Sequence, residues 1–192
     1  MRDRTALLVI DMQIGLVEGA YRADAVLDRI AELIGRARRA GAPIIHVQHH
    51  HTTYAPLEAG APTWHLHPRV APADGERVIG KTASDAFYET PLLDELRRLD
   101  VTHVVVTGMQ TELCVDTTCR RAITLGLDVT LVSDAHTTVD ATLPAESIVA
   151  YHNAVLPELA HPRHHILVRP RDRKSTRLNS SHSSPSRMPS SA

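Results

Sequence analysis

Short runs of mostly apolar, often β-branched residues recur along the chain and constrain its fold more than any other feature. They cover residues 5–10 (TALLVI), 43–48 (PIIHVQ), 76–81 (ERVIGK), 103–108 (HVVVTG), 128–134 (DVTLVSD) and 164–168 (HHILV). Runs of this length without regular polar alternation are typical of strands buried on both faces of a parallel sheet. We therefore predict six strands.

Segments with helical spacing lie between these runs. Residues 24–40 place apolar side chains at helical intervals and stop before Gly41, a good helix terminator. Further helices are expected from Thr90 and Pro91 onward, over 111–125 and over 144–156. Alternating strands and helices predict a three-layer α/β/α, Rossmann-like sandwich with a mostly parallel, six-stranded sheet. Residues 49–75 are expected to form a long loop.

The C-terminal end differs in composition from the rest of the 192 residues. Residues 174–192 contain eight Ser and no acidic residue, so they offer no face that could be buried. The run KSTRLNSSHSS resembles adapter-derived ends of translated sequences. We expect one domain over residues 1–171 and a disordered, non-native Ser-rich tail over residues 172–192.

Charge and hydropathy exclude several classes of partner. The formal net charge is −1, which argues against nucleic-acid binding. The apolar runs are far shorter than the roughly 20 residues of a membrane span, so no membrane partner is expected. The start of the chain lacks a signal-peptide pattern, and two cysteines do not make a disulfide framework. These features predict a cytoplasmic protein.

Three chemically active residues follow or end predicted strands. Asp11 follows the first, Lys81 ends the third, and Cys114 lies just beyond the fourth. Ligands of open parallel sheets bind beyond the carboxyl ends of the strands, so the three should meet there. The first turn of a helix favours a thiolate at Cys114. We interpret Cys114 as a nucleophile, with Asp11 exchanging its proton and Lys81 stabilising the pair. Taken alone, each residue has a common structural explanation: Asp11 as a loop or cap residue, Lys81 as a solvated strand end and Cys114 as a small buried side chain.

Three separated motifs carry a family resemblance. LLVIDMQIGL, VIGKTASDAFYETPL and VVVTGMQTELCVDTTCRRAITLGLDVTLVSDAHTT occur in that order and resemble the isochorismatase-like cysteine hydrolases, over roughly residues 5–157. The resemblance implies an Asp11–Lys81–Cys114 triad and a cis peptide bond between Met109 and Gln110. It also implies an oxyanion hole formed by the backbone N–H groups of Gln110 and Cys114, and assembly into a homodimer or homotetramer.

Two features that distinguish groups within this family indicate the expected activity. Its members that cleave vinyl ethers typically lack the nucleophilic Cys, so Cys114 predicts hydrolysis of a small-molecule amide or carbamoyl C–N bond through a thioester. Its nicotinamidases carry an Asp-x-His metal motif, which VQHHHTT lacks. We therefore expect no metal and no cofactor, although His49 and His51 share a face. The alternatives are a vinyl-ether hydrolase that uses Asp11 as acid and a non-catalytic α/β binding domain.

The substrate-binding residues are expected in the variable segments. Trp64 lies in the long loop and could stack on a planar substrate. Gln13 lies two residues after Asp11, and His136 follows the fifth strand. Phe87 matches a family position near the pocket, and Tyr88 follows it. The second cysteine, Cys119, is expected to be a buried, inert thiol.

Overall fold

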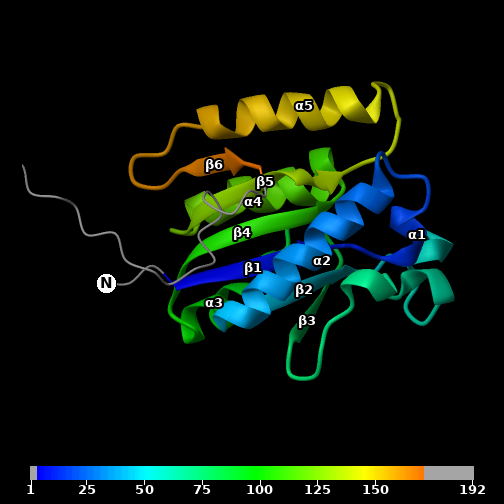
Figure 1. The fold of residues 1–192 in the computed structure, drawn as a ribbon, viewed down its shortest axis with the longest axis horizontal. Coiled ribbons are helices and arrows are strands. Elements are labelled where there is room, and N and C mark those ends of the chain that lie inside the picture. Colours follow the sequence, from blue (N-terminus) through cyan, green and yellow to red (C-terminus); the bar gives the residue numbers. More distant parts are fainter. Residues whose placement is uncertain (1–3, 171–192) are drawn as a thin grey trace, which may run out of the picture.

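A six-stranded sheet forms the centre of the computed structural model, which describes residues 4–170 (Figure 1). Its strands are β1 (Arg4–Ile10), β2 (Ile44–His49), β3 (Arg77–Lys81), β4 (Val101–Met109), β5 (Asp128–Thr137) and β6 (Ile166–Arg169). They lie in the order β3-β2-β1-β4-β5-β6, and each neighbouring pair is parallel. The predicted fold class is confirmed, with a sheet that is parallel throughout. The predicted Ser-rich tail, residues 172–192, lies outside the described residues.

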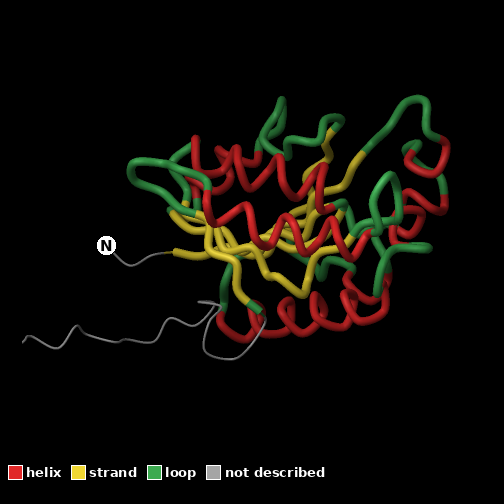
Figure 2. Tube along the Cα trace, turned by 90° about the horizontal axis from the view of Figure 1, so that it is seen from above, coloured by secondary structure: helices red, strands yellow, loops and turns green. Residues whose placement is uncertain are grey.

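Helices lie on both sides of the strands (Figure 2). They are α1 (Ile14–Val17), α2 (Ala23–Ala40), α3 (Leu92–Arg98), α4 (Asp116–Thr124) and α5 (Ala145–Val155). Helix α2 connects β1 to β2, while α4 and α5 connect the strands on the other side of β1. Among the described residues, none of these helices has the length and hydropathy needed to cross a bilayer.

Strand β1 shows why the sheet is covered on both faces. Leu8 and Ile10 belong to one hydrophobic cluster, which includes residues of α3 and α4. Leu7 and Val9 belong to a second cluster, which includes the buried face of α2. All four side chains are 0% exposed. Because each large aliphatic side chain contributes roughly 1.5–3 kcal/mol when buried, two-sided burial makes β1 the centre of the molecule.

The strand order reverses direction between β1 and β4. The chain leaves β1 through α2 toward β2, and leaves β4 through α4 toward β5. Connections that part in this way open a crevice at the carboxyl ends of the two strands, the usual place for a ligand in such sheets. Asp11 and Gln110 follow these two strand ends directly.

The predicted loop over residues 49–75 is organised by three short 3₁₀ turns, η1 (Ala55–Leu57), η2 (Pro62–Trp64) and η3 (Pro68–Val70). Backbone hydrogen bonds tie it to the segment after β1: Ile14 N donates to His65 O at 2.9 Å, and His67 N donates to Met12 O at 2.7 Å. The loop therefore lies beside the end of β1 that carries Asp11.

Candidate active site

Asp11, Lys81 and Cys114 meet at the carboxyl edge of the sheet. Lys81 Nζ lies 2.8 Å from Asp11 Oδ2 and 3.1 Å from Cys114 Sγ. The Asp11 and Lys81 side chains are 1% and 0% exposed, so both charges are shielded from solvent. Buried charges are costly unless they are paired, and this ion pair supplies that compensation. The structure thus brings together the three residues that the sequence nominated.

Cys114 lies in a π-helical turn, η4 (Thr111–Val115), that leads directly into α4. The single helix expected over residues 111–125 is therefore two segments of different winding. Such π segments often occur at functional sites. The Met109–Gln110 peptide bond that precedes the turn is cis, as the family resemblance implied.

Burial raises the pKa of the Cys114 thiol to about 12, and the charge of Asp11 acts in the same direction. Lys81 opposes both effects without cancelling them. Burial also raises the pKa of Asp11, against the effect of Lys81. A raised pKa favours the protonated thiol at rest, whereas the first-turn position alone favoured a thiolate, so attack by this sulfur would need a proton acceptor beside it. The Asp11 carboxylate, with an oxygen within 4.8 Å of Cys114 Sγ, is the candidate acceptor.

Lys81 has two further partners at the centre of the site. Its Nζ lies 2.8 Å from His49 Nδ1 and donates to the backbone oxygen of Ala83 at 2.9 Å. Asp11, His49 and Cys114 each offer an atom that could bind a metal, and these atoms lie within 4.8 Å of one another. The Lys81 ammonium contacts all three residues and so occupies the position that a metal cation would need. The donor set therefore does not fit a metal while Lys81 is seated there. That the active protein needs no metal stays a prediction.

Gln13 holds the loop beside the triad. Its Nε2 donates to His49 O at 2.9 Å and to Trp64 O at 2.8 Å, and its Oε1 accepts from His49 N at 2.8 Å. The Trp64 indole N–H also donates to His49 O, at 3.0 Å. Gln13 and Trp64 are thus next to the site through the backbone of His49. Direct contact of either with a substrate stays a prediction.

Three other predicted pocket residues have distinct environments. Phe87 is 9% exposed and packs in the hydrophobic cluster that Cys114 also contacts, whereas Tyr88 is 53% exposed. His136 is buried; Thr111 Oγ1 lies 2.9 Å from its Nδ1, and Asn153 Oδ1 lies 2.9 Å from its Nε2. These contacts link His136 to the first residue of the π-helical turn. Substrate contacts by these three residues stay predictions.

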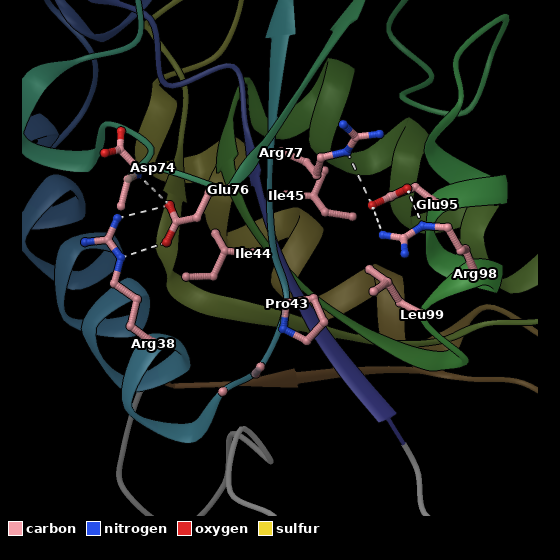
Figure 3. A pocket seen from close by; sticks show the side chains of 14 residues that line it. Arg38, Pro43, Ile44, Ile45, Asp74, Glu76, Arg77, Glu95, Arg98 and Leu99 are labelled. Carbon is pink, nitrogen blue, oxygen red and sulfur yellow. Dashed lines mark hydrogen bonds and ion pairs between the residues drawn. The ribbon is translucent and has the colours of Figure 1, made fainter.

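A cavity of about 580 Å³ lies at the opposite edge of the sheet, where β2 and β3 begin (Figure 3). Two arginines of its lining pair with glutamates: Arg38 binds Glu76 and lowers the pKa of that carboxyl to about 2, and Arg98 binds Glu95. None of its 14 lining residues is a Cys, Ser, His or Lys. This cavity therefore offers no thiol, hydroxyl, imidazole or amine group, whereas Asp11, Lys81 and Cys114 lie at the other edge.

Comparisons with known proteins identify the family. Residues 5–159 match the family model described as the isochorismatase domain, and the chain belongs to the isochorismatase family. It is 41% identical over 143 residues to a streptothricin hydrolase of Streptomyces noursei, a match covering 73% of this chain and 57% of that protein. It is 29% identical over 173 residues to nicotinamidase 3 of Arabidopsis thaliana, covering 81% and 80%.

The fold agrees with solved structures as well. An isochorismatase from Pseudomonas putida KT2440 superposes with a TM-score of 0.80 and 31% identity, covering 88% of each chain. The matched part of this chain spans only 57% and 50% of the lengths of two streptothricin hydrolases. The family is therefore established, while the reaction is a matter for proposal.

Proposed function

We propose that the protein is a cysteine hydrolase that cleaves a small-molecule amide or carbamoyl C–N bond through a thioester. The observation that carries the proposal is the buried Lys81 ammonium, 2.8 Å from Asp11 and 3.1 Å from Cys114. A nucleophile, a proton acceptor and a fixed positive charge are what thiol attack on a carbonyl requires. Relatives named as a nicotinamidase and a ureidoacrylate amidohydrolase support this chemistry.

The proposed reaction begins with transfer of the Cys114 proton to Asp11 as sulfur attacks the carbonyl carbon. The oxyanion accepts hydrogen bonds from the backbone N–H groups of Gln110 and Cys114, an interaction often worth several kcal/mol. Asp11 then protonates the leaving nitrogen as the C–N bond breaks, which leaves an acyl thioester. Water, deprotonated by Asp11, attacks the thioester, and Cys114 recovers its proton. Lys81 stabilises the Asp11 carboxylate at rest and the negative charge that develops on sulfur as its proton leaves.

Substitution of the triad tests the proposal. Cys114→Ala should abolish ammonia release from a panel of small amides, because the nucleophile is gone. Asp11→Asn should lower turnover by about 10²–10⁴-fold through loss of proton transfer. Lys81→Ala should also lower turnover, because a cation beside the thiolate is lost. Cys119→Ala is the matched control, since this thiol is fully buried and should change turnover little.

Mass spectrometry separates this mechanism from the alternative. The protein is mixed briefly with an amide that the wild type hydrolyses, and its intact mass is measured. The wild-type chain should carry an acyl adduct, and Cys114→Ala should carry none. Continued turnover by Cys114→Ala would refute the thioester route. It would favour Asp11 acting as an acid on an ether substrate.

A further inference from the structure

We propose that His49 is a positioning residue that orients the Lys81 ammonium toward Cys114. This inference rests on the proposed role of Lys81 beside the nucleophile. It gives the imidazole at the end of β2 a function that needs no metal ion.

Strand register places the two side chains together. His49 is the last residue of β2 and Lys81 the last residue of β3, and their Cα atoms are partners in the parallel pairing. Paired residues on neighbouring strands point to the same face of a sheet. The 2.8 Å contact between His49 Nδ1 and Lys81 Nζ follows from this register.

The backbone of His49 is held independently of its ring. Its N–H donates to Gln13 Oε1, and its carbonyl oxygen accepts from Gln13 Nε2 and from the Trp64 indole, at 2.8–3.0 Å. Since none of these bonds uses the imidazole, a substitution at His49 keeps its backbone anchors. The ring is thus presented to Lys81 by a preorganised support, which is how a well-built site keeps its geometry.

The donors of the Lys81 ammonium explain what the ring does. An ammonium has three N–H donors. Four acceptors surround them, one more than the donors can each serve: Asp11 Oδ2 and His49 Nδ1 at 2.8 Å, Ala83 O at 2.9 Å and Cys114 Sγ at 3.1 Å. Without an acceptor at position 49, the ammonium would shift toward the Asp11 carboxylate, its charged partner. Nζ would then be drawn away from the sulfur.

The protonation of His49 suits the role of acceptor. Burial lowers its pKa to about 4, and the charge of Lys81 acts in the same direction. The ring is therefore neutral near pH 7, with Nδ1 free to accept while Nε2 carries the proton.

Alkylation of Cys114 by iodoacetamide tests the inference without any amide substrate. A failure of the proposed hydrolase activity therefore leaves this test valid. His49→Leu should react about tenfold more slowly at pH 8, because a rise of one unit in the thiol pKa removes nine-tenths of the thiolate. His49→Asn should react at nearly the wild-type rate, since its Oδ1 can replace Nδ1 as acceptor. Intact mass should show one adduct, and none on Cys114→Ala.

Matched controls separate this role from packing. His51→Leu removes the neighbouring imidazole, whose ring centroid is 6.0 Å from that of His49, and should leave the rate unchanged. In a Lys81→Ala background, His49→Leu should cause no further slowing. The inference is overturned if His49→Leu reacts at the wild-type rate, if His49→Asn is equally slow, or if the slowing persists without Lys81.

The same alkylation assay, run with EDTA and with added Zn²⁺, tests whether His49 binds a metal instead. Dialysis against EDTA should leave the wild-type alkylation rate unchanged, and added Zn²⁺ should not protect Cys114. Protection by Zn²⁺ that His49→Leu removes would make His49 a metal ligand and would overturn its assignment as a positioning residue.

Discussion

Burial is the largest cause of the pKa shifts of Asp11, His49 and Cys114 in this site. A helix dipole at a first turn contributes about 0.3–1 kcal/mol, which would shift the pKa of a thiol by less than about one unit. Burial and Asp11 instead raise the pKa of Cys114 from 9.0 to about 12. The larger effect favours a protonated thiol at rest, so the proposed reaction has Asp11 accept the Cys114 proton during attack.

His136 gives a pH dependence that can be predicted at the same scale. Asn153 Nδ2 donates to Ser133 O, so its Oδ1 accepts from His136 Nε2, and His136 Nδ1 accepts from Thr111. Burial lowers the pKa of His136 from 6.5 to about 4. Between these two values the unfolded chain binds more protons than the folded one, so stability is full above pH 6.5 and falls toward pH 4.

The loss attributable to His136 should reach about 3 kcal/mol at pH 4. The free energy of unfolding in urea is measured for the wild type and for His136→Asn at pH 7.5, 6.5, 5.5 and 4.5. The difference between the two proteins separates the contribution of His136 from those of other titrating groups. The variant should be less stable at pH 7.5 and show a shallower decline on acidification. Parallel declines would mean that His136 titrates normally in the folded protein.

At the scale of elements, the close approach of β1 and β4 depends on a single glycine. Gly108 pairs with Ile10 in the sheet and has a φ of 119°, a conformation that other residues rarely adopt. A Cβ added there would lie 2.0 Å from Ile10 O. Neither backbone can move without disturbing the two strands that carry Asp11 and the turn of Cys114.

We therefore expect Gly108→Ala to destabilise the fold by more than about 3 kcal/mol, or to prevent its expression in soluble form. Gly80→Ala on β3 is the matched control, because no heavy atom beyond its chain neighbours lies within 4 Å of the added carbon. It should change the free energy of unfolding by less than about 1 kcal/mol. Equal stability of the two variants in urea unfolding would contradict this explanation.

At the scale of the whole molecule, the domain is expected to be independent of the Ser-rich end of the chain. Deletion of residues 174–192 should leave the melting temperature and the alkylation rate of Cys114 unchanged, because that composition cannot bury an apolar face. A fall of several degrees, roughly 1 kcal/mol or more for a domain of this size, would show that the segment packs. The expected homodimer or homotetramer also stays a prediction, which light scattering of both versions can test.

Residue pattern by itself determined the order of strands and helices along the chain and the three residues that meet at one edge of the sheet, Asp11, Lys81 and Cys114; their catalytic roles stay predictions. Continuous apolar runs can be buried only inside a covered sheet, and side chains at the carboxyl ends of its strands must share one edge. The motifs around Asp11, Lys81 and Cys114 indicated the family, and that resemblance implied the cis peptide bond at Met109–Gln110. These inferences succeed because they depend on local spacing and on chain order.

Only the tertiary structure decided how these groups affect one another. The contact of His49 with Lys81 depends on the register between β2 and β3, which no local pattern in VQHHHTT specifies. The raised pKa of Cys114 depends on how deeply the π-helical turn is covered and on its distance from Asp11. Burial and distance arise from packing between segments far apart in the chain, so they could not be read from the residues one by one.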